Sequence, residues 1–121
     1  MKPEYEFFDA TSVEWTSASP GVEGLKERVL AVDEGSGVAT RMLRFEPGTD
    51  TSPNGVVTHD FWEEVYILEG EIHDLTLDEV FNAGMYACRP PGMQHGPWVS
   101  KPGCTTFEVR YSAITPPSTE E

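Results

Sequence analysis

The stretch GMYACRPPGMQHGPWV, residues 84–99, carries glycine, proline and histidine at close, regular spacing. Its parts MYACR and HGPWVS have the composition of strands, and the PPG between them forms a turn. The pattern therefore predicts two short strands, with His95 held just after the turn. A second stretch, VVTHDFWEEVYILEG at residues 56–70, also carries a histidine, a glutamate and a closing glycine.

The rest of the chain is punctuated in the same way, with eleven Gly and ten Pro among 121 residues. Residues 25–45 read as two strands around a DEGSG turn, although LKERVLAV at 25–32 also has the spacing of a short helix. Glu69-Gly70 is expected to turn the chain after the run VYIL, and TTFEVRYSAI supplies a last strand. About eight short strands result, which predicts an all-β sandwich or small barrel.

Charge and length limit the function. The chain has 8 Lys+Arg against 21 Asp+Glu, a net charge of −13. Such a surface repels phosphate backbones and anionic lipid, so we expect no nucleic-acid partner and no membrane partner. The sequence contains no apolar run long enough for a transmembrane helix, and MKPEYEFFDA lacks the apolar core of a signal peptide. A cytoplasmic location is therefore expected.

One domain is expected, over residues 1–114, followed by a disordered acidic tail, TPPSTEE, at 115–121. The two cysteines, Cys88 and Cys104, fit a reduced compartment, and a disulfide bond between them is the alternative. Cys88 is expected to be a small buried side chain.

Two of the three histidines suggest a metal site. If His59 ends one strand and Glu63 begins its neighbour, both can point into one barrel mouth, and the segment after the PPG turn can bring in His95. Two imidazoles and one carboxylate suit a divalent ion, Fe(II) above all, with Mn, Ni or Zn as alternatives. The third histidine, His73, is expected roughly 10 to 13 Å from Glu63 along the strand ladder, too far to share an ion.

These two stretches resemble the two motifs of the cupin superfamily. The first, G-x(5)-H-x-H-x(3,4)-E-x(6)-G, is matched by His59, Glu63 and Gly70; the second, G-x(5)-P-x-G-x(2)-H-x(3)-N, is matched by Gly84, Pro90, Gly92 and His95. The resemblance covers residues 38–112. It implies a single-domain cupin, that is, a double-stranded β-helix or jelly-roll barrel, with His59, Glu63 and His95 as metal ligands.

Two positions depart from the cupin pattern. The first histidine of the H-x-H pair falls on Val57, and the final asparagine falls on Val99. Three ligands of four suffice for a 2-His-1-carboxylate iron site. The alternative is a cupin without metal, in which Glu63 is a buried carboxylate of raised pKa and Glu63 or His59 acts as general base.

Candidate substrate contacts surround these residues: Val57, Phe61, Trp98 and Arg110. Phe61, Trp62 and Trp98 have the alternative of packing in the core or at the rim. Arg110 alternates with Val109 and Tyr111; facing inward it would pair with an anion, but an outward, solvated position is expected. Glu64 is expected on a solvated strand face.

A looser resemblance is to small ChrR-like and acetylacetone-cleaving cupins, and it implies a non-haem metal protein of the dioxygenase type acting on a small organic substrate. Redox-neutral chemistry (isomerase, dehydratase, decarboxylase or polyketide cyclase) and a non-catalytic ligand-binding cupin remain alternatives. Cupins commonly dimerise through N-terminal strands, so residues 1–30 are the candidate homodimer contact. The looser resemblance rests on Trp15, the PGV at 20–22, Lys26, the TRMLRFEPG at 40–48 and the GC at 103–104.

Overall fold

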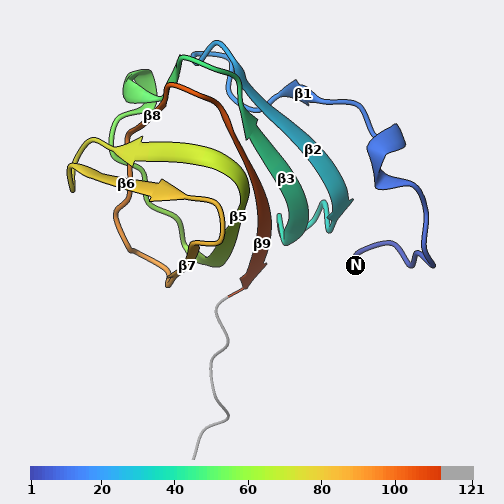
Figure 1. Ribbon diagram of the computed structural model, residues 1–121. Helices are drawn as coiled ribbons and strands as arrows, with labels where there is room; N and C mark the ends of the chain where they lie inside the picture. The colour runs from blue at the N-terminus through green and yellow to red at the C-terminus, as the bar shows by residue number, and fades with distance from the viewer. Residues whose placement is uncertain (113–121) are drawn as a thin grey trace, which may run out of the picture.

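The structure is a computed structural model, described here for residues 1–112. It is built almost wholly from antiparallel strands, which curl into an open barrel (Figure 1). The all-β jelly-roll architecture predicted from the sequence is thereby confirmed. The tail predicted at 115–121 lies outside the described residues. The strands are β1 (Thr16–Ser17), β2 (Leu25–Val32), β3 (Ala39–Phe45), β4 (Thr49–Asp50), β5 (Phe61–Asp74), β6 (Glu79–Asn82), β7 (Tyr86–Arg89), β8 (Trp98–Ser100) and β9 (Cys104–Ser112).

The strands at residues 25–45 form as the turn signal predicts. Strands β2 and β3 pair in antiparallel fashion from Leu25↔Phe45 to Val32↔Ala39, so the helical alternative for residues 25–32 is wrong. Strand β9 lies between β3 and β5, and β7 pairs with Glu63–Tyr66 of β5. The C-terminal end of β5 pairs instead with β6 and β8. Strand β5 therefore belongs to both faces of the barrel.

Gly70 is the corner at which β5 passes from one face to the other. The expected hairpin turn at Glu69-Gly70 is wrong, because the strand continues through this point with a bulge between Ile67 and Glu69. Gly70 has φ +79°, and a Cβ there would lie 2.0 Å from the carbonyl oxygen of Gly103. Only glycine combines this backbone conformation with so close an approach of β9. The turn residues therefore mark a bend within one strand.

The hydrophobic core lies between the two faces. It contains Val22, Leu25, Leu43, Phe45, Ile67, Ile72 and Cys104, with Ala18, Phe81 and Trp98 packed against it. Both cysteines are free thiols, so there is no Cys88–Cys104 bridge. Cys88 is exposed on β7, contrary to the expectation of burial, because it alternates with Ala87 and Arg89, which line the interior. No helix among the described residues is long and apolar enough to cross a membrane.

Candidate metal site

The fold brings His59, Glu63 and His95 together. Glu63 lies near the start of β5, His59 in the loop before it, and His95 in the loop between β7 and β8. One ligand atom from each residue lies within 4.8 Å of the others. Nε2 of His95 is 3.9 Å from Oε1 of Glu63, and both side chains are almost fully buried. The two sequence stretches thus supply the three predicted ligands at one point.

Backbone hydrogen bonds hold the two histidine segments side by side. Val57 and His95 form an isolated antiparallel bridge in which each N–H donates to the other's carbonyl oxygen at 2.9 Å. The N–H of Gly92, in the PPG turn, donates to the carbonyl of His59 at 2.7 Å. The turn therefore positions both imidazoles through the backbone.

The surroundings of both imidazoles favour the neutral form, which can act as a metal ligand. Burial lowers the pKa of His59 and of His95, and nearby arginines lower it further. Nδ1 of His95 lies 3.2 Å from the carbonyl oxygen of Met93, which can only accept a hydrogen bond, so Nδ1 carries the proton. The lone pair of Nε2 is then left facing Glu63. A neutral imidazole with a free nitrogen is the form that binds metal.

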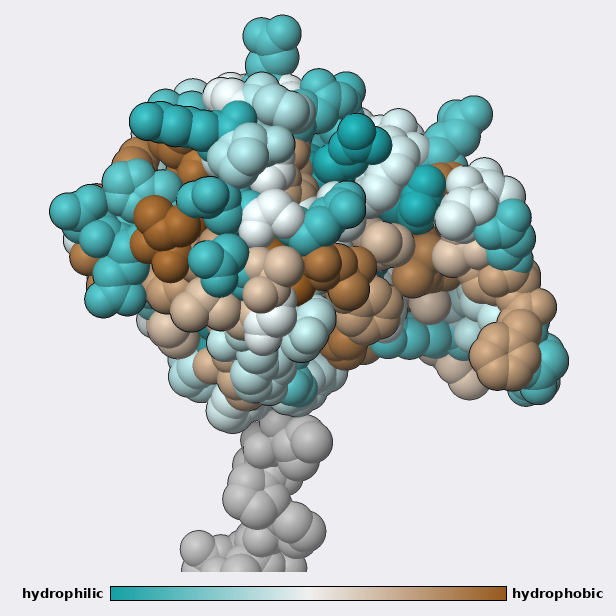
Figure 2. Space-filling model, in the orientation of Figure 1, coloured by the Kyte–Doolittle hydropathy of each residue, from teal (hydrophilic) through white to brown (hydrophobic). Residues whose placement is uncertain are grey.

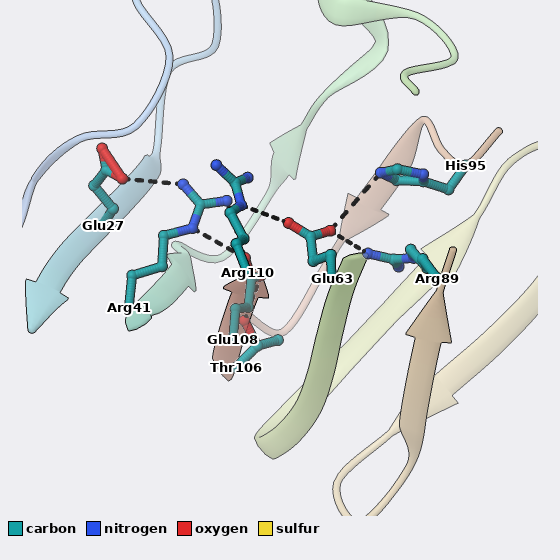
Figure 3. Close-up of polar contacts among 8 residues, drawn as sticks. All are labelled: Glu27, Arg41, Glu63, Arg89, His95, Thr106, Glu108 and Arg110. Atoms are coloured by element: carbon teal, nitrogen blue, oxygen red, sulfur yellow. Dashed lines mark hydrogen bonds and ion pairs between the residues drawn. The ribbon is translucent and has the colours of Figure 1, made fainter. Parts of the chain in front are cut away.

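Two arginines hold the carboxylate of Glu63 (Figure 3). Nη1 of Arg89 donates to Oε1 at 2.9 Å, and Nε of Arg110 donates to Oε2 at 2.8 Å. Burial alone would raise the pKa of Glu63, but Arg110 and Arg89 outweigh it, so the pKa is lowered. The raised pKa expected for a metal-free site is therefore wrong. So is the expectation that Arg110 faces solvent.

A second ion-pair network lies beside the first. Arg41 donates through Nε to Glu108 at 3.0 Å and through Nη1 to Glu27 at 3.0 Å. The hydroxyl of Thr106 donates to the other oxygen of Glu108 at 3.0 Å. Burial opposes the charge of Arg41, yet the two carboxylates outweigh it and raise its pKa. Arg41 is thus fully neutralised within the protein.

The arginines of both networks, together with Glu108, line a cavity of about 260 Å³ inside the barrel. Three of the predicted substrate contacts, Val57, Trp98 and Arg110, lie in its wall, together with His59, Glu63 and His95. Phe61 lies behind this wall. Its ring stacks on His59 with centroids 4.5 Å apart, and the guanidinium of Arg110 lies 5.0 Å from its centroid.

Comparison with known proteins agrees with this architecture. The profile of the ChrR cupin-like domain matches residues 4–113. The chain belongs to the ChrR cupin-like family. No curated protein sequence matches it.

Solved structures similar to this cupin domain share its fold. An RmlC-like cupin from Shewanella frigidimarina is 23% identical with a TM-score of 0.70, over 91% of this chain and 93% of that one. The polyketide cyclase RemF from Streptomyces resistomycificus is 22% identical with a TM-score of 0.70, over 88% and 79%. An acetylacetone dioxygenase from Acinetobacter johnsonii is 12% identical with a TM-score of 0.66, over 88% and 72%. At these identities the similarity establishes the fold alone.

The donor set of this cupin suits a divalent ion. Ligand bonds from nitrogen or oxygen to such an ion are about 2.0–2.2 Å long, which places ligand atoms about 3–4 Å apart. The 3.9 Å between Nε2 of His95 and Oε1 of Glu63 lies in this range, and the whole group, with its atoms within 4.8 Å of one another, is slightly wider. The ionised carboxylate and the neutral imidazoles provide the charge and lone pairs that the ion requires. The residues present therefore fit a metal ion.

The other residues considered from the sequence lie away from this point. His73 lies on the C-terminal part of β5, and its Nε2 forms a hydrogen bond with Oδ1 of Asp78 at 2.8 Å. As expected, it is not among the three candidate metal ligands. The expected distance rested on a turn at Glu69-Gly70 that does not exist. Glu64 is not simply solvated: it accepts hydrogen bonds from the hydroxyls of Tyr86 and Tyr111 on the opposite face of the sheet. The ring of Trp62 stacks on Tyr111 there.

Sequence reasoning missed Arg89, Arg41 and Glu108. One reason is the unusual polarity of β9: its interior face carries Glu108 and Arg110, whereas Phe107 lies on the outer face. The usual rule places the charged face of a strand in water. A usable signal was the cross-strand register, which sets Glu63 opposite both Arg89 and Arg110.

Proposed function

We propose that this cupin is a mononuclear metal-dependent enzyme that acts on a small organic substrate, in a non-haem dioxygenase type of reaction. The observation that carries the proposal is the group of His59, Glu63 and His95 in the wall of an interior cavity. Fe(II) is the favoured ion, because two histidines and one carboxylate leave open positions for substrate and oxygen. Mn, Ni and Zn are the alternatives.

Each residue of the site has a role in this proposal. His59, Glu63 and His95 would hold the ion, which supplies Lewis acidity and, as iron, oxygen activation. Arg89 and Arg110 keep Glu63 ionised and fix its orientation through one hydrogen bond to each oxygen. Val57 and Trp98 line the same cavity, where their apolar side chains would limit the access of water.

The structural neighbours include proteins named as an acetylacetone dioxygenase and as a polyketide cyclase. Their names fit either oxidative or redox-neutral chemistry on carbonyl compounds. Oxygen dependence separates these two classes. We would load the metal-free protein with Fe(II), Mn(II), Ni(II) or Zn(II) and screen β-diketones and keto acids with an oxygen electrode. Stoichiometric oxygen uptake with Fe(II) supports the dioxygenase proposal, whereas product formation without oxygen contradicts it.

A metal-free acid–base enzyme is the second candidate, and one observation favours it. Glu63 is already neutralised by Arg89 and Arg110, so its carboxylate is stabilised without an ion. Its lowered pKa makes it a weak base, so His59, which is half-buried and neutral, becomes the better candidate. Turnover that survives exhaustive chelation would establish this candidate. Turnover that is lost on chelation and restored by one metal would exclude it.

A further inference from the structure

The cations around Glu63 point to the class of substrate. We propose that the cavity binds an amphipathic organic carboxylate, with its charged head between Arg89 and Arg110 and its apolar body in a neighbouring chamber. The inference deepens the proposed function and rests on it, because it names the substrate of the same site. It is carried by charge balance, by unused donors and by the shape of the interior.

Charge balance differs between the two arginine networks. Arg41 is bonded to two carboxylates, those of Glu27 and Glu108. Arg89 and Arg110 share the single carboxylate of Glu63. The six groups balance in total, but the cationic surplus lies at Glu63 (Figure 3). A buried or half-buried guanidinium is costly without a counter-charge, so this end of the network favours an additional anion.

A metal ion would enlarge the surplus. A divalent ion on His59, Glu63 and His95 would add two positive charges to a balanced interior. The chain as a whole is strongly acidic, at −13, yet two of its eight Lys and Arg residues, Arg89 and Arg110, share a single carboxylate in the wall of this cavity. An anionic ligand beside the ion would balance this local excess of positive charge.

Hydrogen-bond donors remain for such a ligand. A guanidinium has five N–H donors. Arg110 uses its Nε on Glu63, and Arg89 uses one Nη1 hydrogen. Within residues 1–112, neither has a further hydrogen-bond acceptor in the protein. The planar fork of arginine suits a carboxylate, and these two residues already hold one.

An apolar chamber of about 370 Å³ adjoins the charged cavity. Arg89, His95 and Trp98 line both spaces, so the chamber begins where the cations end. Its wall is largely apolar, from β5 through β6 and β7. Figure 2 shows apolar surface between hydrophilic side chains on the side of the molecule where β6 lies in Figure 1. The apolar residues of the chamber include Val65, Ile67, Ile72, Phe81, Met85 and Met93.

Arg89 lies where the carboxylate head of the proposed ligand would meet its apolar body. Its guanidinium lies 5.2 Å from the ring centroid of Trp98 while donating to Glu63. A carboxylate placed at Arg89 and Arg110 would therefore direct its attached carbon chain or ring past Trp98 into the chamber. A small anion without an apolar group would leave the chamber unfilled.

The test compares matched probes on the wild-type protein by titration calorimetry. Phenylacetate carries both the head and the body, phenylacetamide has a neutral head, and acetate lacks the body. We expect phenylacetate to bind at least about tenfold more tightly than either control, a difference of about 1.4 kcal/mol. Equal affinity for the acid and the amide, or no binding of phenylacetate at millimolar concentration, would overturn the inference.

Variants locate the binding. Arg110→Gln and Arg89→Gln should each weaken phenylacetate binding at least about tenfold, whereas Arg44→Gln, an exposed arginine on β3, should leave it unchanged. An equal loss in Arg44→Gln would count against the assignment. The acid–amide comparison needs no variant, so it stands even if one of these proteins fails to fold.

The titrations are run on Zn(II)-loaded and chelated protein, with metal content measured on the same samples. If the protein takes up no Zn(II) when loading is attempted, yet still prefers the acid to the amide, the carboxylate inference is supported and the metal-dependent function is contradicted. Bound metal without acid selectivity would leave the function standing and overturn the substrate class.

Discussion

Val57 and His95 exchange both backbone hydrogen bonds, each N–H donating to the other's carbonyl at 2.9 Å. In such an antiparallel pair the two side chains project from the same face, with Cα atoms about 5.5 Å apart. Val57 also lines the cavity that holds the three candidate ligands. It stands at the position where the cupin pattern has its first histidine. The backbone at this position is thus placed as a fourth ligand would require, but the side chain of Val57 offers no ligand atom.

Val57→His should therefore add a ligand to the site. We expect metal affinity to increase by about tenfold or more, or about 1.4 kcal/mol, because a fourth protein donor joins three that are already placed. Competition with a chromogenic chelator measures the change. Thr58→His, one residue along and exposed, is the matched control and should leave affinity unaltered. Weaker binding in Val57→His would show that the ion does not sit beside this bridge.

Stability of the metal-free protein should rise with pH as the pH approaches about 6.5 from below. Burial lowers the pKa of His59 and His95 in the folded state. The unfolded chain therefore binds more protons in this window, and each histidine adds up to about 1.4 kcal/mol per pH unit until its unfolded pKa of about 6.5 is passed. Urea unfolding across this range measures the slope.

The double variant His59→Asn/His95→Asn provides the comparison for this pH profile. Its free energy of unfolding should rise less steeply than that of the wild type below pH 6.5, and in parallel with it above. The lowered pKa of Glu63 acts in a separate window, since its contribution is present above about pH 4.5 and is lost as pH falls further. Equal slopes in both proteins between pH 5 and 6.5 would mean that the imidazoles are not buried as described.

Gly70→Ala tests the corner in β5. Gly70 and Gly37 have nearly equal positive φ values, +79° and +77°, but a Cβ at Gly37 meets nothing within 4 Å. Gly37→Ala should therefore cost only about 1–2 kcal/mol for the left-handed backbone. Gly70→Ala should cost at least about 2 kcal/mol more, because its Cβ would collide with the carbonyl of Gly103. Similar losses in the two variants would argue against the close approach of β9.

The spacing of His59, Glu63 and His95 was enough to predict one site, because two motifs fix which residues meet at the barrel mouth. The two arginines that bind the carboxylate of Glu63 were not predictable in the same way. Arg110 was expected in solvent because charged faces of strands usually meet water, whereas here the charged face of β9 lines the cavity and Phe107 faces outward. The glycine at position 70 was ambiguous in the same way, because it permits a bend within β5 beside its neighbour β9 rather than a hairpin turn.

The most direct test of the metal site is the metal content of the untagged protein, measured by elemental analysis after reconstitution with each candidate ion. His59→Ala and His95→Ala remove predicted ligands, and His73→Ala removes the histidine outside the group. The account predicts close to one equivalent of iron, manganese, nickel or zinc in the wild type and in His73→Ala, and its loss in the other two variants. Wild-type protein that takes up none of these metals, or a loss in His73→Ala equal to that in His59→Ala, would contradict it.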